Sequence, residues 1–371
     1  MNAFDIASRR RGAPVRPQPV KSTLSKPDLP QTFENRVMHS WAVAGHWLGV
    51  LDRALHEAVD APDVLGDAAR WQIEGDAKRI RARLALAAGH AMGADMLAVV
   101  RIAAAVELLH EASLVHDDLQ DRDTLRRGKN TVWVEFGEEL AITLGDWMIN
   151  QAYDVLLQME TGPQKLRRIA RAMSKAVGET VCGQARENVA KSCLTTSPSD
   201  YIDMATGKTA PLLAFPLESV AVLADRSEDE IASIRSGLEC LGGAYQLRDD
   251  LIDLLGEKGR GMAGADLVEG KATLPVLLLY TQADQALRSE IEMYIQSDRA
   301  ERETRAEDFA AQLVSHQVFD DVCEMVDGLV QMGHQTLQGA PPSVCFLVRM
   351  VFSKLLVPVQ RQGKDIRVAV G

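Results

Sequence analysis

Two groups of aspartate residues in this chain have the same spacing, Asp-Asp-x-x-Asp. Their members are Asp117, Asp118, Asp121, Asp249, Asp250 and Asp253. On a helix, residues four positions apart share a face, so the first and last aspartate of each group point the same way. Carboxylates this close repel one another, and divalent cations that prefer oxygen ligands are their natural partners. Because Mg²⁺ completes its coordination shell with substrate phosphates, two facing groups predict a site where Mg²⁺ ions bridge to a diphosphate.

A simpler explanation of one such group is a solvated acidic helix end, because short motifs recur by chance. Here each group ends a long apolar stretch, over residues 96–119 and 234–255, that is expected to be buried on most faces. Two buried helices that both end in several carboxylates are hard to explain as exposed surface. The pair of groups therefore favours metal binding.

Basic residues occur at spacings that suit phosphate binding. Arg126 and Arg127 follow the first aspartate group, and a guanidinium can bind two phosphate oxygens at once. His110 precedes that group by two helical turns, and Lys78 and Arg81 share one face of a predicted helix. Taken alone, each has a simpler interpretation, as a core histidine or an exposed basic run. Together with the two aspartate groups, they favour an anion site.

The elements that must position these side chains are predicted to be helices. From about residue 32, apolar residues recur at i, i+3, i+4 and i+7, whereas aromatic residues make up only 5% of the chain. Turn-forming residues separate the helical stretches. The predicted helices cover residues 32–59, 66–91, 96–119, 138–160, 164–191, 199–224, 228–256, 271–296, 303–315, 317–338 and 342–358. The expected fold class is all-α.

Composition excludes several classes of protein. The 371 residues are 46% hydrophobic, and no apolar run reaches the ~20 residues needed to cross a membrane, so no stable membrane insertion is expected. The net charge of −11 argues against nucleic-acid binding, although a site in an acidic protein can be locally basic. The five scattered cysteines lack a Cys-x-x-Cys pair, which predicts free thiols and a cytoplasmic location.

The first 31 residues differ from the rest of the chain. They are rich in proline, serine and arginine and lack a following apolar stretch, which predicts a disordered N-terminal extension over residues 1–31. A transit peptide is the alternative interpretation. Residues 32–371 are predicted to form one domain.

Several motifs resemble the trans-isoprenyl diphosphate synthase family. The string LLHEASLVHDDLQDRDTLRRGKNTVW is similar, nearly residue for residue, to the first aspartate-rich region of that family. The strings GQARENV, GKTAPLL, GAYQLRDDLIDLLG and DLVEGKATLPV follow in the family's order, so the resemblance spans about residues 70–280. It implies the isoprenoid synthase fold, a single large helical bundle around a central cavity, in a homodimer.

The resemblance also implies a reaction, the head-to-tail condensation of isopentenyl diphosphate with an allylic prenyl diphosphate. The six aspartates would bind about three Mg²⁺ ions, or Mn²⁺, at the allylic diphosphate. The residues in direct contact with that diphosphate would be Arg126, Lys208 and Lys271. The site for isopentenyl diphosphate would consist of Lys78, Arg81, His110 and Arg127. Thr209 and Gln246 would lie beside the developing carbocation.

The chain departs from the family pattern in two places that bear on the site. The family has glycines before and a proline after the basic run, and a lysine beyond the second aspartate group. This chain has Asp76, Ala77 and Ala82 at the first place and Gly261 at the second. Arg260 or Lys258 would have to supply the missing positive charge. The C-terminal segment that contains Pro341-Pro342 is also atypical.

Residues one turn before the first aspartate group are expected to set the product length. Ala112 and Ser113 are small, and Leu109 lies one turn deeper. At ~1.5 Å of helix per residue, two turns of depth hold roughly two more prenyl units. We expect the C20 product, geranylgeranyl diphosphate, with farnesyl or longer polyprenyl diphosphates as alternatives.

Two other classes of protein can share this fold, a terpene cyclase and a non-catalytic subunit of a heteromeric synthase. A cyclase would not need the basic set for isopentenyl diphosphate, and a non-catalytic subunit would lose aspartates from one group. This chain keeps both features, which favours condensation.

Overall fold

Long helices make up most of the structure. The computed structural model describes residues 32–75, 77–256, 263–357, 359–362 and 365–368. The helices are α1 (Phe33–Ala58), α2 (Asp63–Ile73), α3 (Ile80–Met92), α4 (Met96–Asp121), α5 (Val132–Phe136), α6 (Glu138–Leu157), α7 (Pro163–Ala190), α8 (Pro198–Leu223), α9 (Glu228–Leu254), α10 (Ala265–Val268), α11 (Leu274–Gln282), α12 (Gln285–Gln296), α13 (Arg299–Ser315), α14 (Gln317–Thr336) and α15 (Pro342–Leu355). The all-α class predicted from the sequence is confirmed.

Short elements complete the chain. A 3₁₀ helix, η1, covers Leu337–Gly339. Two antiparallel hairpins pair β1 (Leu125–Arg126) with β2 (Lys129–Asn130), and β3 (Val359–Gln362) with β4 (Asp365–Val368). Neither hairpin was expected from the helical periodicity, and the last helix ends before the position predicted for it.

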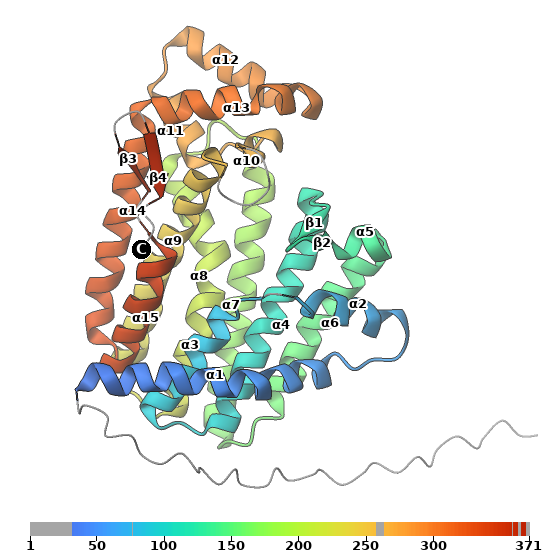
Figure 1. Ribbon diagram of the computed structural model, residues 1–371, viewed down its shortest axis with the longest axis vertical. Helices are drawn as coiled ribbons and strands as arrows, with labels where there is room; N and C mark the ends of the chain where they lie inside the picture. Colours follow the sequence, from blue (N-terminus) through green and yellow to red (C-terminus); the bar gives the residue numbers. More distant parts are fainter. Residues whose placement is uncertain (1–31, 76, 257–262, 358, 363–364, 369–371) are drawn as a thin grey trace, which may run out of the picture.

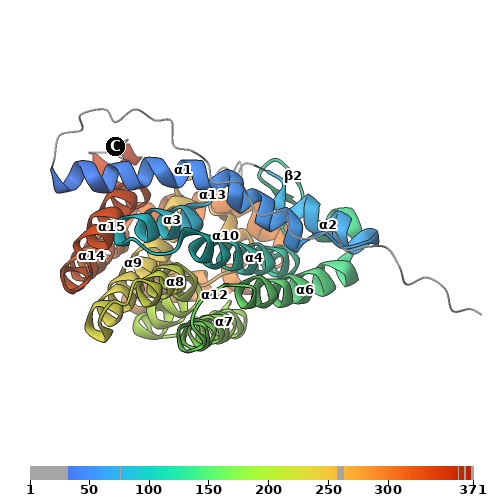
Figure 2. The ribbon, with the colours of Figure 1, turned by 90° about the horizontal axis from the view of Figure 1, so that it is seen from below.

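The long helices lie side by side as a bundle (Figure 1). Within it, α4 packs against α6, α7 against α8, α8 against α9, and α9 against α14. Figure 2, seen along the bundle, shows α7, α8 and α9 next to one another and α4 beside α6. α1 crosses one end of the bundle, and α12 and α13 lie at the opposite end (Figure 1).

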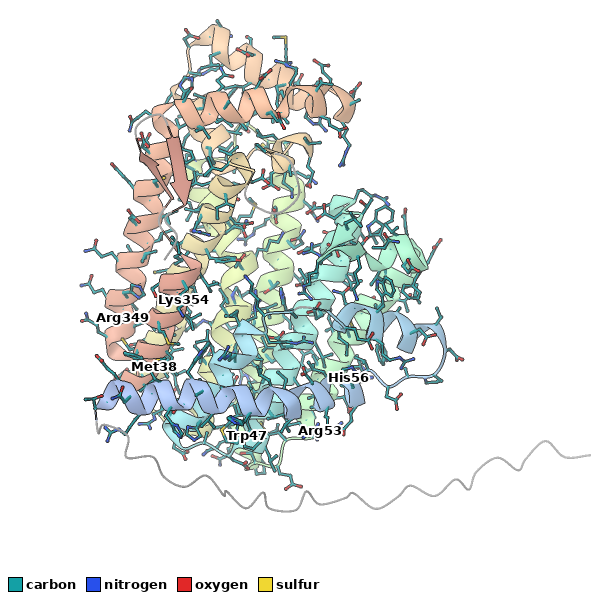
Figure 3. All side chains as sticks on the ribbon, in the orientation of Figure 1. Met38, Trp47, Arg53, His56, Arg349 and Lys354 are labelled. Carbon is teal, nitrogen blue, oxygen red and sulfur yellow. The ribbon has the colours of Figure 1, made fainter. Side chains whose placement is uncertain are left out.

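α1 can cover the end of the bundle because it is amphipathic. Its buried residues include Val37, Ala44 and Leu51, which recur every seven positions and so share one face. That face packs against α3, α4 and α15. Arg53 and His56, which are exposed, lie on the side of α1 that faces solvent (Figure 3).

Both aspartate groups occupy the last turns of long helices, as the sequence predicts. The first group ends α4, whose buried residues lie on every side because α1, α3, α6 and α8 pack around it. α4 stops at Arg122, which adopts a left-handed φ of 61°. The second group ends α9. The fold therefore brings two carboxylate-rich helix ends into the same bundle.

Two of the predicted helices are wrong because each is interrupted. Residues 66–91 contain α2, which ends at Ile73, and α3, which begins at Ile80, and residues 271–296 contain α11 and α12. The first break is fixed by Arg79, whose φ of 48° is left-handed and whose Nη1 donates to Glu107 of α4 at 3.3 Å. Helical periodicity carries no signal for such a long-range bond.

Some predictions concern residues outside the described part of the chain. They are the extension over 1–31, Asp76, and the loop that contains Lys258, Arg260 and Gly261. The buried apolar core of the described residues extends from α1 to α15. The prediction of one domain over 32–371 stays a prediction. In the part described, no helix combines the length and the apolar character that crossing a membrane requires.

Candidate active site

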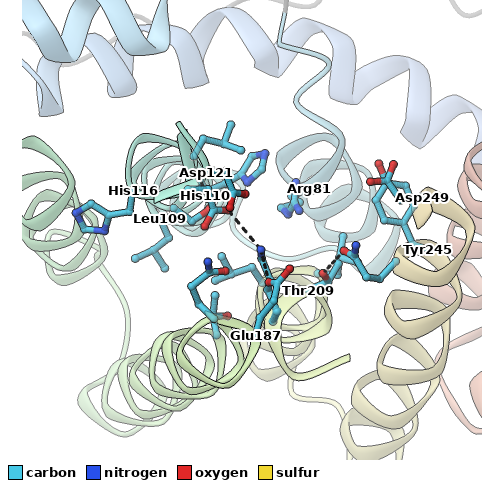
Figure 4. A pocket seen from close by; sticks show the side chains of 18 of the residues that line it. Arg81, Leu109, His110, His116, Asp121, Glu187, Thr209, Tyr245 and Asp249 are labelled. Atoms are coloured by element: carbon cyan, nitrogen blue, oxygen red, sulfur yellow. Dashed lines mark hydrogen bonds and ion pairs between the residues drawn. The ribbon is translucent and has the colours of Figure 1, made fainter. Parts of the chain in front are cut away.

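A cavity of about 780 Å³ lies within the bundle. Residues of α4, α7, α8 and α9 line it, together with the segment before α3 and two residues of α15, Phe352 and Leu355. Figure 4 shows Asp121 and His110 of α4 on one side of this space, with Arg81, Glu187 and Thr209 around it. The wall combines carboxylates, basic side chains and apolar side chains.

The first aspartate group divides between the cavity and the protein interior. Asp117 and Asp121 line the cavity. Asp118 is 1% exposed and accepts a hydrogen bond from Arg126 Nε at 2.6 Å. Arg126 itself lines the cavity. The three aspartates, predicted as equivalent ligands, therefore differ, because only the outer two share the face of α4 that borders the cavity.

Asp121 lies between two lysines. Lys271 Nζ is 3.1 Å from Asp121 Oδ2, and Lys191 Nζ is 3.0 Å from Asp121 Oδ1. Burial by itself would raise the pKa of Asp121, but Lys271 and Lys191 lower that pKa below its ordinary value. Asp121 is therefore a stable carboxylate at neutral pH.

Asp117 has a less favourable environment. Burial raises the pKa of Asp117 from 3.8 to about 6, although Lys208 opposes the shift. Lys208 Nζ is 4.0 Å from Asp117 Oδ2 and donates a shorter hydrogen bond, 2.6 Å, to Glu187 Oε2. An ionised Asp117 is thus only partly compensated by protein groups, and a further cation beside it would stabilise its charge.

The second aspartate group also divides between the cavity and the interior, but at different positions. Asp249 and Asp250 line the cavity, whereas Asp253 is 2% exposed and accepts a hydrogen bond from the backbone N of Asp266 at 2.9 Å. Asp253 therefore ties the start of α10 to the end of α9. Asp250 accepts from the buried hydroxyl of Tyr201 at 2.7 Å. Its other oxygen accepts from Gln246 Nε2 at 3.3 Å.

Thr209 and Gln246 are brought together as predicted. Thr209 Oγ1 donates to Gln246 Oε1 at 3.1 Å, so α8 and α9 share a polar chain that continues to Asp250 and Tyr201. Thr209 and Gln246 both line the cavity between the two aspartate groups. Their oxygens are fixed dipoles that can face a developing positive charge.

The donor atoms fit a divalent cation that prefers oxygen. Four aspartates of the two groups border the cavity, Asp117, Asp121, Asp249 and Asp250, and the carboxylates of Glu107, Asp123, Glu187 and Asp266 line it as well. Among the described residues, no three His, Cys, Asp or Glu side chains converge closely enough to hold a metal ion by themselves. Mg²⁺ needs only one or two protein carboxylates when phosphate oxygens complete its shell. The arrangement therefore fits a metal that binds together with a phosphate ligand.

The predicted basic set lines the cavity as well. Its members are Lys78, Arg81, His110 and Arg127. Burial lowers the pKa of the Arg81 guanidinium, although Glu107 favours its charge, and its Nε has no hydrogen-bond partner among the described residues. Burial and the neighbouring Arg81 and Arg127 hold the pKa of His110 well below its ordinary value, so His110 is neutral at pH 7. An anion placed here would meet desolvated cations and a neutral imidazole donor.

Two buried glutamates on α4 bind arginines of the segments that carry this basic set. Glu107 accepts from Arg79 Nη1 and from the backbone N of Ala82 at 3.1 Å. Glu111, whose side chain is 1% exposed, accepts from both terminal nitrogens of Arg127 at 3.2 and 3.3 Å. The glutamates are one turn apart, so one face of α4 anchors both arginine-bearing segments.

The apolar part of the wall corrects one predicted position. Leu109 and Ser113 line the cavity, together with Ile149 of α6 and Val177 of α7. Ala112 is fully buried and is absent from the lining residues. The α4 residues that line the cavity include Leu109, Ser113, His116, Asp117 and Gln120, and Ala112 is not among them although its helical spacing is compatible with theirs.

The sequence analysis assigned no role to several residues that the structure places at the site. They are Glu107, Glu111, Glu187, Lys191 and Tyr201. Charged residues inside the apolar run IAAAVELLHEASLV were a usable signal, because a glutamate is rarely buried without a cation. Lys191 gave no such signal, since it follows an exposed, polar stretch of α7.

The fold and this cavity define a class of protein. The chain belongs to the polyprenyl synthetase family, whose profile matches residues 62–313. It is similar to the short chain isoprenyl diphosphate synthase of Methanothermobacter thermautotrophicus, with 32% identity over 245 residues, 65% of this chain and 75% of that protein. It is also similar to the farnesyl diphosphate synthase of Geobacillus stearothermophilus, with 32% identity over 280 residues, 73% of this chain and 90% of that protein.

A solved structure agrees with this assignment. The crystal structure of geranylgeranyl pyrophosphate synthetase from Pyrococcus horikoshii matches with a TM-score of 0.77 and 26% identity, and covers 86% of this chain and 98% of that chain. The predicted isoprenoid synthase fold is thus confirmed, and the protein is an enzyme, a prenyltransferase of the isoprenyl diphosphate synthase class. The relatives are named for different products, so family membership leaves the product length undetermined.

Proposed function

We propose that the enzyme condenses isopentenyl diphosphate with an allylic prenyl diphosphate and releases pyrophosphate, with Mg²⁺ as cofactor. One observation carries the proposal: the cavity has a carboxylate region and a basic region, joined by apolar wall. The carboxylates suit a metal-bound diphosphate, and the buried cations suit a diphosphate that binds without metal.

The allylic diphosphate belongs beside the carboxylates. Asp117, Asp121 and Asp249 would hold Mg²⁺, or Mn²⁺, with Asp250 supporting them through its bonds to Tyr201 and Gln246. Bound metal neutralises the charge that develops on the leaving diphosphate. The side chains that would bind phosphate oxygens directly are Arg126, Lys208 and Lys271. In this arrangement, Asp118 and Asp253 position their neighbours rather than bind metal.

Isopentenyl diphosphate belongs in the basic region. Arg81 and Arg127 would bind its phosphates, with Lys78 at the exposed edge of the cavity and His110 as a neutral donor. Glu107 and Glu111 would keep the arginine-bearing segments in place. The binding site would thus be formed before the substrate arrives, which reduces the cost of ordering the site.

The bond changes follow from the two binding regions. The allylic C–O bond breaks, the isopentenyl double bond attacks the allylic carbon, and a proton leaves the resulting cation. The oxygens of Thr209 and Gln246 would stabilise positive charge, and the apolar wall would exclude water from it. The released pyrophosphate is the base placed to accept the proton.

We propose the C20 product, geranylgeranyl diphosphate. Leu109 and Ser113 line the apolar wall below the first aspartate group, and Ser113 is small enough to let a growing chain pass. Ala112, which is buried outside the cavity, no longer supports this proposal. The homodimer and the cytoplasmic location predicted from the sequence stay predictions.

The proposal is tested by incubating the full chain with isopentenyl diphosphate, Mg²⁺ and, in turn, allylic primers of one, two or three prenyl units. We expect elongation of each primer to a C20 diphosphate, read by mass, and no reaction with EDTA. A C15 product, or one longer than C20, would overturn the C20 assignment alone. A cyclic hydrocarbon formed from a prenyl diphosphate, without elongation, would overturn condensation.

A further inference from the structure

Lys191 contacts Asp121, although it is not one of the residues that line the cavity. It follows the last turn of α7, and its Nζ is 3.0 Å from Asp121 Oδ1 and 3.4 Å from Glu269 Oε2. Lys271 Nζ is 3.1 Å from the other oxygen, Asp121 Oδ2, and 2.8 Å from Glu269 Oε2. Both oxygens of a cavity carboxylate are thus engaged by lysines.

The backbone holds the two lysines in this arrangement. The backbone N of Ala272 donates to the carbonyl oxygen of Lys191 at 2.6 Å, and Ser192 Oγ donates to the carbonyl oxygen of Gly270 at 2.9 Å. The end of α7 is therefore tied to the segment on both sides of Lys271. Two ammonium groups held this close repel each other unless carboxylates lie between them.

We infer that Lys191 is a positioning residue that makes metal binding at Asp121 depend on a bound diphosphate. This inference rests on the proposed function. While Oδ1 of Asp121 binds Lys191, the ammonium charge repels a metal ion that approaches the same oxygen. Glu269, which contacts both lysines and has a side chain only 5% exposed, retains Lys191 once Asp121 releases it. The metal alone must compete with the lysine, whereas a metal that carries a diphosphate gains further ligands and further cationic contacts.

The inference concerns Lys191 rather than Lys271. Lys271 lines the cavity and would bind phosphate directly, so its loss weakens both metal and diphosphate binding. Lys191 approaches Asp121 from outside the cavity lining. Removing Lys191 therefore removes a competitor for the metal without removing a proposed diphosphate ligand.

The test is Mn²⁺ binding by the full chain, measured by electron paramagnetic resonance with and without inorganic pyrophosphate. In the wild type we expect weak Mn²⁺ binding that pyrophosphate strengthens. Lys191→Met should bind Mn²⁺ alone about three to five times more tightly, the range expected for removal of a partly exposed ion pair. The ratio of the Mn²⁺ affinity with pyrophosphate to the affinity without it should fall by the same factor.

Controls separate the inference from loss of structure and from failure of the proposed function. Lys175→Met changes a lysine of α7 that lies 3.6 Å from Glu179 and does not line the cavity, and this variant should bind Mn²⁺ like the wild type. Lys191→Gln gives a second variant if Lys191→Met melts early. Unchanged or weaker Mn²⁺ binding in the folded Lys191 variants would overturn the inference. Wild-type protein that shows no effect of pyrophosphate on Mn²⁺ binding would instead count against the proposed function.

Discussion

At the scale of single residues, buried glutamates determine where the arginines of the cavity point. Arg79 and Arg127 both adopt left-handed backbone conformations, with φ of 48° and 51°, which are unfavourable for a residue with a side chain. Glu107 and Glu111 bind these two arginines from one face of α4. The ion pairs thus offset local strain and fix the arginine-bearing segments at the cavity.

Changing Glu111 to glutamine tests this role. The amide keeps the size and an acceptor oxygen but removes the charge that pairs with Arg127. We expect the KM for isopentenyl diphosphate to rise about tenfold, with kcat changed less than about twofold, because Arg127 loses its fixed orientation. Steady-state kinetics with varied isopentenyl diphosphate measure both constants. Glu160→Gln, at an exposed position, is the control, and a loss of kcat with unchanged KM would contradict the role.

Site residues that could be predicted from the sequence belong to local motifs, whereas those that could not be predicted contact residues far away in the chain. The aspartate groups could be found from their own spacing, whereas Lys208 and Lys271 were found through the resemblance of their motifs to the family. Lys191 is 70 residues from Asp121 in the chain, and no local pattern connects them. Ala112 was misplaced because helical spacing says which residues share a face, but not which face borders the cavity.

At the scale of helices, a glycine allows the close approach that positions Lys208 at the cavity. A Cβ added to Gly183 of α7 would lie 2.4 Å from the backbone N of Lys208 and 2.7 Å from the carbonyl carbon of Gly207 on α8. No rotamer change relieves a clash with backbone atoms. The crossing of α7 and α8, and with it the position of Lys208, therefore depends on the missing side chain.

Gly183→Ala is expected to destabilise the protein by about 1 to 3 kcal/mol, the usual cost of overpacking, and to reduce activity through displacement of Lys208. Thermal unfolding and the elongation assay measure the two effects. Gly178→Ala is the matched control on the same helix, because a Cβ there meets no atom within 4 Å. It should leave activity unchanged and raise stability by up to about 1 kcal/mol. Equal effects of the two substitutions would refute the importance of the close crossing.

Most helices could be predicted because their apolar faces are continuous in the sequence. The break between α2 and α3 could not, because the contact that accompanies it joins Arg79 and Glu107, 28 positions apart. The β1–β2 hairpin is likewise held by distant residues, with Trp71 Nε1 donating to the carbonyl oxygen of Asn130 at 3.0 Å. The segment before α3 and the β1–β2 hairpin, which carry Lys78 and Arg127, are thus the parts of the site that helical periodicity predicts least well.

At the scale of the whole molecule, the first and last helices close the bundle. α1 packs against α15, and α15 contributes Phe352 and Leu355 to the cavity wall. α14 packs along α9, the helix that ends in the second aspartate group. The site therefore depends on segments that contain none of the residues proposed for catalysis.

This closure bears on where the chain can be cut. The family profile covers residues 62–313, a fragment that lacks α1, α14 and α15. Buried residues of α3 and α9, such as Leu241, would lose the helices that pack against them. We expect that fragment to aggregate or to melt without a cooperative transition, whereas a chain that begins at residue 32 should unfold like the full protein. Size-exclusion chromatography and circular dichroism on both would decide. A monodisperse, cooperatively melting 62–313 fragment would mean that the stretch matched by the family profile folds by itself. Aggregation of the fragment would mean that this stretch needs α1, α14 and α15 in order to fold.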